Sequence, residues 1–461
     1  MSRIYRYVPV SSPRHTRVLR LEPSPDAASP LRCSLSEVSL DALEDPSTGY
    51  TALSYTWDAQ SPSQIVECDG GTLHVTANCE AAMRRLRRPD ETHALWIDSI
   101  RIDQSAAAID ERSAQVAVMG EVYMRAKQVV VWLGESDEKF EVFLRRLAEI
   151  FESLRMPSSP GRFTNITELR DILLGVLREK VRAIAREAPT ASDDPFAAVF
   201  ERSWFHRMWT IQEVTLSLPE RIVVRCGEHT FPWQPFLGIV TVLRDAEYPW
   251  RGWKRAMGLR QALWSYLKLK RHPGARELVR DGPLFEQDPH MFSILQGVRN
   301  KCSGDPMDNV FALYGLFQEL GIPMPTPDYR KSVGQVYKEA TAACINYDRS
   351  LRILYHASSD LRREDLSSWV PDYSSPGWED SDMRYGLIGI HVAAGGSSRE
   401  ALRRTLVINH LEVLADEAAP GNFRHWYDVL TDERLDSESL VRTLMGGPGM
   451  RFHRIAMAFP L

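Results

Sequence analysis

The pattern of apolar positions alternates between two periods over the first half of the chain. YTALSYTW (50–57), ALWID (94–98) and VVVWLG (129–134) are apolar or aromatic runs of strand length. Residues 78–88 and 110–126, which separate them, carry the helical period. Strands that alternate with helices of this length indicate βαβ units, in which the strands pair in parallel through right-handed crossovers. The pattern therefore predicts an α/β fold with a mainly parallel sheet flanked by helices.

Two further segments predict hairpins or strand-turn pairs. QIVECDGGTLHVT (64–76) is typical of a hairpin because Asp69-Gly70-Gly71 tolerate the positive φ angles of a tight turn. RIVVRCGEHTFPW (221–233) predicts a strand followed by a turn. Beyond residue 236 the pattern becomes mostly helical, and the segment SSWVPDYS is expected to bury Trp369, Val370 and Tyr373.

The length of 461 residues is too great for one ordinary domain. We expect a lead-in segment at 1–46 packed on the domain that follows it. The α/β domain should occupy 47–235, and a mostly α-helical C-terminal region should occupy 236–461.

Composition excludes several classes of protein. The chain is 44% hydrophobic and 25% charged, as in soluble globular proteins, and its net charge of −5 favours neither a nucleic-acid nor a membrane partner. Its six cysteines lack the spacing of a zinc site or a disulfide framework, and no apolar run is long enough for a membrane span. The N-terminus has no secretory pattern. We therefore expect a cytoplasmic protein with no metal site, and we interpret RRLRR (84–88) as a solvated helix face.

The candidate ligand-binding residues lie where the predicted parallel strands end, because ligands of such sheets bind outside the carboxyl ends of the strands. The first strand ends at Tyr55, Trp57 and Asp58, and the second ends at Asp98, with Arg101 shortly after it. This mixture of rings and charges suits a polar aromatic ligand such as a nucleotide. Structural roles compete with this interpretation, since Asp98 could cap the following loop and both aromatic rings could be core.

The segment RMWTIQEV (207–214) places a carboxylate in an aromatic helix. With Ser203 as N-cap, a helical wheel puts Gln212 in the middle of the apolar face and Glu213 at its edge, beside Trp209. We expect Gln212, and Gln115 on the helix 110–126, to tie their helices to loop backbone, because buried amides need partners. From the residues alone, Glu213 has two possible roles, a site residue in a groove or an ordinary boundary carboxylate.

Four motifs resemble a known family. YTALSYTW, ALWIDSIRIDQ, ERSAQVAVMGEVYMRAKQVVVWLGE and RMWTIQEV are similar to the successive motifs of the fungal heterokaryon-incompatibility (HET) domain, in the family's order, over about residues 47–216. Two departures stand out. Asp58 takes the place of a usual glycine, and Arg101 takes the place of the cysteine in the family's DxxCINQ.

The HET domain is in turn similar to TIR domains, which have a flavodoxin-like fold. The resemblance matches Ser54-Tyr55 to the Ser-Tyr that ends the first TIR strand. It matches Trp209 and Glu213 to a W-x-x-x-E motif whose glutamate is catalytic in NAD-cleaving members. The resemblance therefore implies Glu213 as the catalytic residue, with no cofactor required and NAD as the possible substrate. The expected ligand contacts are Ser54, Tyr55, Trp57, Asp58, Asp98, Arg101 and Trp209.

The resemblance leaves two functions open, both in fungal non-self recognition and programmed cell death. One is an enzyme that hydrolyses NAD, or a related nucleotide, at Glu213. The other is a non-catalytic signalling module that self-associates or binds a partner protein when incompatible cells fuse.

Overall fold

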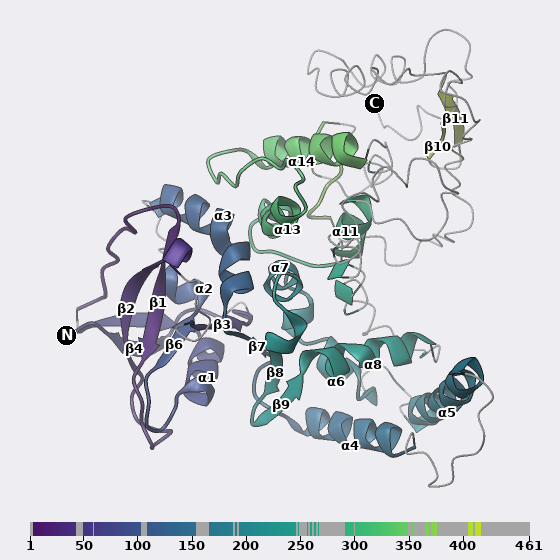
Figure 1. The fold of residues 1–461 in the computed structure, drawn as a ribbon, viewed down its shortest axis with the longest axis horizontal. Helices are drawn as coiled ribbons and strands as arrows, with labels where there is room; N and C mark the ends of the chain where they lie inside the picture. Colours follow the sequence, from purple (N-terminus) through teal and green to yellow (C-terminus); the bar gives the residue numbers. More distant parts are fainter. Residues whose placement is uncertain are drawn as a thin grey trace. The chain divides into compact units, whose positions relative to one another are not determined.

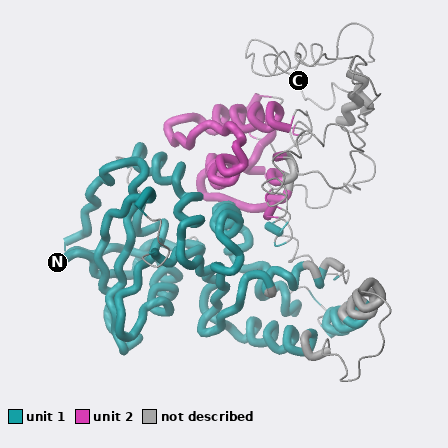
Figure 2. Tube along the Cα trace, in the orientation of Figure 1, with its two compact units in different colours: residues 1–260 teal, residues 261–461 magenta. Residues whose placement is uncertain are grey.

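The chain divides into two compact units, Met1–Arg260 and Gln261–Leu461 (Figure 2). The computed structural model describes residues 3–42, 49–58, 60–102, 108–153, 166–187, 193–245, 291–298 and 300–348, a hairpin within 404–415, and single residues or short runs between 190 and 375. The division follows Arg260, whereas the sequence suggested a domain boundary after residue 235. Helix α8 (Trp233–Asp245) accordingly belongs to the first unit.

A nine-stranded sheet organises the first unit, in the order β5-β4-β2-β1-β6-β3-β7-β8-β9 (Figure 1). Its strands are β1 (His15–Leu21), β2 (Arg32–Ser39), β3 (Thr51–Ser54), β4 (Gln64–Cys68), β5 (Gly71–Val75), β6 (His93–Trp96), β7 (Gln128–Trp132), β8 (Ile222–Cys226) and β9 (His229–Pro232). The run β6-β3-β7-β8 is parallel throughout, which confirms the α/β prediction. The hairpins β4-β5 and β8-β9 are antiparallel, so the sheet as a whole is mixed.

The N-terminal segment contributes two strands to the middle of this sheet. Strand β1 pairs antiparallel with β2 on one side and with β6 on the other, so that Leu19 lies opposite both Leu35 and Leu95. The segment was expected only to pack on the domain. Its apolar side chains Val18, Leu19 and Leu21 are buried, which explains why HTRVLRL forms an interior strand.

Helix α1 (Ala77–Leu86) covers one face of the sheet. The Thr76 hydroxyl accepts a hydrogen bond from the Cys79 amide at 3.2 Å and so caps the helix at its N-terminus. Met83 of this helix belongs to the same buried cluster as Tyr55 and Ile97, which follow β3 and β6. This cluster buries one face of the central strands.

Helix α3 (Ile109–Arg125) covers the opposite face. The Tyr50 hydroxyl donates to the Val122 carbonyl at 2.7 Å, and the rings of Trp96 and Tyr123 meet edge to face with centroids 5.2 Å apart. Gln115 bonds to the Thr16 hydroxyl and to the His15 carbonyl, so it ties α3 to backbone as predicted, but that backbone belongs to strand β1 and not to a loop. Both faces of the parallel strands are therefore covered, as their continuous apolar sequences predict.

The helix expected to run on from Ser203 is interrupted. A 3-10 turn (Ser203–Phe205) is followed by a bend, and helix α7 starts only at Thr210 and ends at Thr215. The Thr210 hydroxyl donates to the Arg207 carbonyl at 2.7 Å, a local bond that competes with a continuous helix. The single-helix prediction is therefore wrong here.

The arginine run at 84–88 is not a plain solvated face. Arg84 donates to the carbonyls of Ala27 and Ser29, and Arg87 donates to four carbonyls between Asp26 and Pro30. These side chains fasten the loop before β2 onto α1. Among the described residues, the first unit also contains α2 (Asp98–Arg101), α4 (Glu138–Ser153), α5 (Ile166–Glu187) and α6 (Ala197–Phe200).

The described part of the second unit is mostly helical between residues 291 and 348. It contains α11 (Met291–Val298), α12 (Asp308–Phe311), α13 (Tyr314–Glu319), α14 (Val333–Asp348) and an antiparallel hairpin of β10 (Arg404–Ile408) and β11 (Leu411–Ala415). Val370 is buried and the half-buried Tyr373 ring contacts Tyr337, while Trp369 lies outside the described residues. None of the helices that the structure describes has the length and apolarity needed to cross a bilayer.

Candidate functional site

Ser54, the last residue of β3, joins the central sheet to the segment that carries Glu213. Its hydroxyl donates a hydrogen bond to Oε2 of Glu213 and accepts one from the indole N–H of Trp204 at 2.8 Å. Ser54 and Glu213 are both fully buried. The structure thus brings two of the predicted site residues together at the carboxyl end of a parallel strand, where this class of sheet binds ligands.

Glu213 is fully buried, so the expectation that it lies at the edge of the apolar helix face, partly open to a groove, is wrong. Its exposed fraction is 0%. The helical wheel assumed a continuous helix from Ser203, but the bend before Thr210 breaks the phase between the two parts. A position calculated from Ser203 therefore does not hold for Glu213.

Arg207 lies in this bend and connects the ends of two strands. Its Nη2 lies 2.6 Å from Oδ2 of Asp98, and its Nη1 donates to the carbonyl of Tyr55. Burial by itself lowers the pKa of Arg207, but the negative charges of Asp98 and Glu213 raise that pKa by more. The guanidinium is therefore held in its charged form between two carboxylates.

Asp98 has the structural role that its sequence position suggested and an ion pair that the sequence did not suggest. Oδ1 accepts a hydrogen bond from the Ser99 amide at 2.7 Å, which is the expected loop cap, while Oδ2 pairs with Arg207. The hydroxyl of Tyr55 reaches the same turn and donates to the Ser99 hydroxyl at 2.5 Å. The Tyr55 ring itself is fully buried in the cluster under α1, and this burial raises the pKa of its hydroxyl.

Asp58 occupies a position whose backbone favours glycine. Its φ of 51° lies in the left-handed region, which accounts for the glycine usual in similar sequences. The carboxylate offsets this strain locally, since it accepts hydrogen bonds from Thr56 at 2.6 Å and from Ser203. Asp58 thereby ties the end of β3 to the turn that presents Trp204.

Trp57 and Trp209, two of the predicted ligand contacts, pack within the protein or support its backbone. Trp57 is half-buried and packs against the cluster under α1. Trp209 is 8% exposed, and its carbonyl accepts the amide hydrogen of Glu213 at 3.4 Å as the first turn of α7 begins. The Trp209 backbone therefore supports the carboxylate-bearing turn.

Arg101 lies apart from the Ser54–Glu213 pair. Its guanidinium is 1% exposed, bonds to the Thr16 hydroxyl and stacks over the Trp96 ring at 4.7 Å. Its Nε and Nη1 atoms have no hydrogen-bond partner among the described residues. Burial lowers the pKa of Arg101 well below its usual range, because the charged guanidinium loses its hydration in the interior. Keeping this charge buried therefore costs folding free energy.

The resulting cluster, here called the acid–arginine cluster, consists of Ser54, Asp98, Trp204, Arg207 and Glu213. With both carboxylates ionised it carries one more negative than positive charge. A surplus negative charge in a dry site stabilises a nearby positive charge far more strongly than it would in water. Because Ser54 and Glu213 are fully buried, a ligand reaches the carboxylate only if their hydrogen bond opens. No group of His, Cys, Asp and Glu side chains in the described residues is arranged to hold a metal ion.

Sequence reasoning missed Arg207, Trp204 and Ser99. A signal for Arg207 was present, since it is a lone cation between His206 and a run of large apolar residues. Most buried arginines are paired with a carboxylate. That rule would have paired Arg207 with one of the strand-end acids.

Comparison with known proteins identifies the part of the chain that carries this cluster. Residues 50–213 match the family model described as Heterokaryon incompatibility protein (HET). The Neurospora crassa protein "Heterokaryon incompatibility protein 6, OR allele" is 27% identical, over 80% of this chain and 59% of its own length. No solved structure matches the chain significantly. The chain therefore contains a heterokaryon-incompatibility (HET) domain, whose matched residues run from Tyr50, just before β3, to Glu213 of the acid–arginine cluster.

Proposed function

We propose that this protein acts in the cytoplasm in fungal non-self recognition and programmed cell death, by cleaving NAD or a related nucleotide at Glu213. The HET match over residues 50–213 and the similarity to a heterokaryon incompatibility protein support the biological role. The observation that carries the chemical role is the placement of Glu213 against Ser54 at the carboxyl end of β3, beside Arg207 and Asp98.

The proposed reaction breaks the glycosidic bond between nicotinamide and C1′ of the ribose. Nicotinamide leaves with the bonding electron pair, and positive charge develops on the ribose. The Glu213 carboxylate stabilises that charge and orients the ribose hydroxyls. Water then adds to C1′ and releases a proton, so that NAD and water give ADP-ribose, nicotinamide and a proton. Tyr55, Trp57, Asp58, Asp98 and Trp209 are the proposed contacts for the rest of the nucleotide. Arg101, which bonds to Thr16 and stacks on Trp96, is left out of this proposal.

The burial of Glu213 adds a condition to this proposal. Because the carboxylate is fully buried, the reaction requires a second state in which the Ser54–Glu213 bond is broken. Self-association or a partner protein would supply the free energy for that opening. The same burial favours a second candidate function, a non-catalytic signalling module in which Glu213 only holds β3 and α7 together.

Nicotinamide release by the purified full-length chain, measured over a range of protein concentrations, tests the two candidates. We expect release that rises more than linearly with protein concentration and that Glu213→Gln abolishes. The matched control is Glu67→Gln, because Glu67 is half exposed in a surface pair with Arg32. Cell death without loss of NAD, in the unaltered protein, would contradict the enzymatic proposal and support the signalling module.

A further inference from the structure

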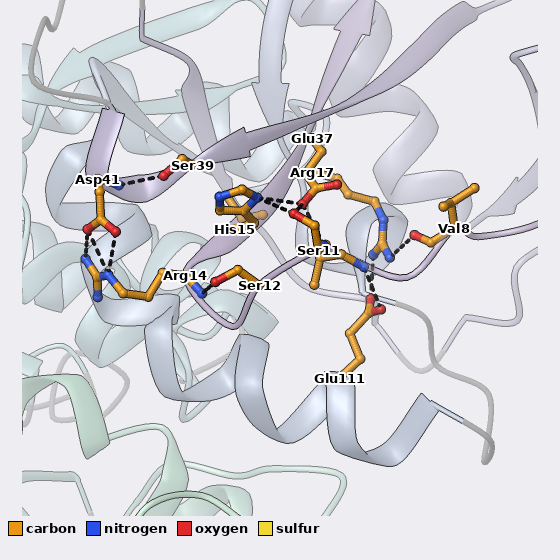
Figure 3. Close-up of polar contacts among 12 residues, drawn as sticks. Val8, Ser11, Ser12, Arg14, His15, Arg17, Glu37, Ser39, Asp41 and Glu111 are labelled. Atoms are coloured by element: carbon orange, nitrogen blue, oxygen red, sulfur yellow. Dashed lines mark hydrogen bonds and ion pairs between the residues drawn. The ribbon is translucent and has the colours of Figure 1, made fainter.

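The segment 3–14, here called the N-terminal latch, crosses the outside of the first unit and is fastened to several elements, among them α2, α3 and β2. The Tyr7 hydroxyl donates to the Ile100 carbonyl of α2 at 2.8 Å. The Val10 amide donates to the Glu111 carboxylate of α3 at 3.3 Å. The amide and the hydroxyl of Ser11 donate to the Glu37 carboxylate of β2 at 2.7 and 2.6 Å (Figure 3).

Arg17 on β1 is the point where these attachments converge. Its Nη2 donates to the Val8 carbonyl at 2.6 Å, and its Nη1 donates to the Arg101 carbonyl at 2.6 Å. The same guanidinium pairs with Glu111 at 2.7 Å (Figure 3). Arg17 is only 4% exposed, so these bonds are shielded from water. One side chain thus joins the latch, the end of α2 and the start of α3.

Helix α2 needs such support because it is only four residues long. One helical turn fixes many dihedral angles for very few internal hydrogen bonds and is unstable by itself. The carbonyls of Ile100 and Arg101 lie at its C-terminal end, where a helix leaves carbonyls without internal partners. Tyr7 and Arg17 satisfy these two carbonyls, and a cation at this end also interacts favourably with the helix dipole.

Helix α2 carries a residue of the acid–arginine cluster at its other end. Asp98 is the first residue of α2 and pairs with Arg207, and Ser99 accepts the hydrogen bond of Tyr55. A displacement of this single turn therefore moves Asp98 away from Arg207. We propose that the N-terminal latch sets the position of Asp98 through α2, which makes Arg17 a positioning residue of the candidate site. The consequence for catalysis rests on the proposed function, but the placement of α2 does not.

Hydrogen exchange of the full-length chain tests the latch directly. We expect Arg17→Gln to speed the exchange of the Ile100 and Ile102 amides, which close the α2 turn, at least tenfold. The amides of β7 and β8 should keep their protection. Arg17→Lys, which retains the charge but loses the double attachment, should give a smaller increase. Arg32→Gln, in an exposed pair, serves as the matched control and should change neither region.

Tyr7→Phe keeps the ring and removes one hydroxyl, so it replaces Arg17→Gln if that variant fails to fold. Unchanged exchange of the Ile100 and Ile102 amides in a folded variant of either residue would overturn the proposal. Nicotinamide release gives the second readout, and a fall in kcat with little change in KM is expected for Arg17→Gln. If the unaltered protein releases no nicotinamide, the proposed function fails while the exchange result still decides the latch.

Discussion

Arg207 and Asp98 form a largely buried ion pair, with Nη2 and Oδ2 2.6 Å apart, that joins the bend before α7 to the turn after β6. Removing one partner of such a pair leaves an uncompensated charge in the interior. We expect Arg207→Met to lower the free energy of unfolding by about 3–5 kcal/mol, measured by urea denaturation. The double variant Arg207→Met with Asp98→Asn should lose less than the sum of the single changes. Strictly additive losses would show that the two side chains are not coupled.

Glu213→Gln should cost stability as well as activity, because Glu213 is buried. The amide retains an oxygen that can accept the Ser54 hydrogen bond but removes a charge that stabilises Arg207. We expect the free energy of unfolding to fall by about 1–3 kcal/mol, the usual cost of an imperfectly satisfied buried group. Glu67→Gln, at an exposed pair, should stay within about 1 kcal/mol of the parent. A Glu213→Gln protein as stable as the parent would mean that Glu213 contributes no net stabilisation to Arg207.

Arg101→Met should preserve or increase stability. Arg101 is fully buried, stacks on Trp96 and has no carboxylate among the hydrogen-bond and ion-pair partners described for it. An apolar side chain of similar length avoids the cost of desolvating the charge, and such replacements stabilise by about 1–4 kcal/mol in favourable cases. The midpoint of thermal unfolding should therefore stay or rise. A clear fall would indicate that the stacking on Trp96 and the bond to Thr16 outweigh that cost.

His93 should make the protein less stable in mild acid. Burial lowers its pKa from the usual value, and its ring bonds to Thr51 and to the Leu86 carbonyl. Below about pH 6.5 the unfolded chain binds a proton that the folded chain does not, so stability is lost as the pH falls toward the folded pKa. We expect the free energy of unfolding of the parent, relative to His93→Gln, to decline over this interval. Parallel curves for the two proteins would refute the assignment.

The elements that the sequence predicted correctly are those with a strong local pattern. Residues 129–132 of the predicted run 129–134 form a buried parallel strand because the run is continuously apolar and β-branched, and 64–76 forms a hairpin because Asp69 and Gly70 both take positive φ. The N-terminal strands escaped detection, since their pairing with β6 is a long-range contact that a local pattern cannot reveal.

The candidate site shows the same limit. The resemblance pointed to Ser54 and Glu213, and the structure places them in contact. Gln212 is buried as expected, but its side-chain amide has no hydrogen-bond partner among the described residues, so the predicted tie to loop backbone is wrong. The bend at Arg207 explains the wrong exposure of Glu213. A helical wheel is valid only while the helix is unbroken, and tertiary bonds to Tyr55 and Asp98 accompany the break.

The central place of β1 also sets the order in which the chain can fold during synthesis. Strands β1 and β2 leave the ribosome first and can pair with each other, but one side of β1 stays open until residues 93–96 have been made. An open strand edge is a template for pairing with another chain. A nascent chain stalled before β6 would therefore expose such an edge. A fragment cut to the matched segment 50–213 would expose such an edge permanently along β6, where β1 is missing, and along β7, where β8 is missing. Recombinant work on this HET domain therefore requires residues on both sides of the matched segment.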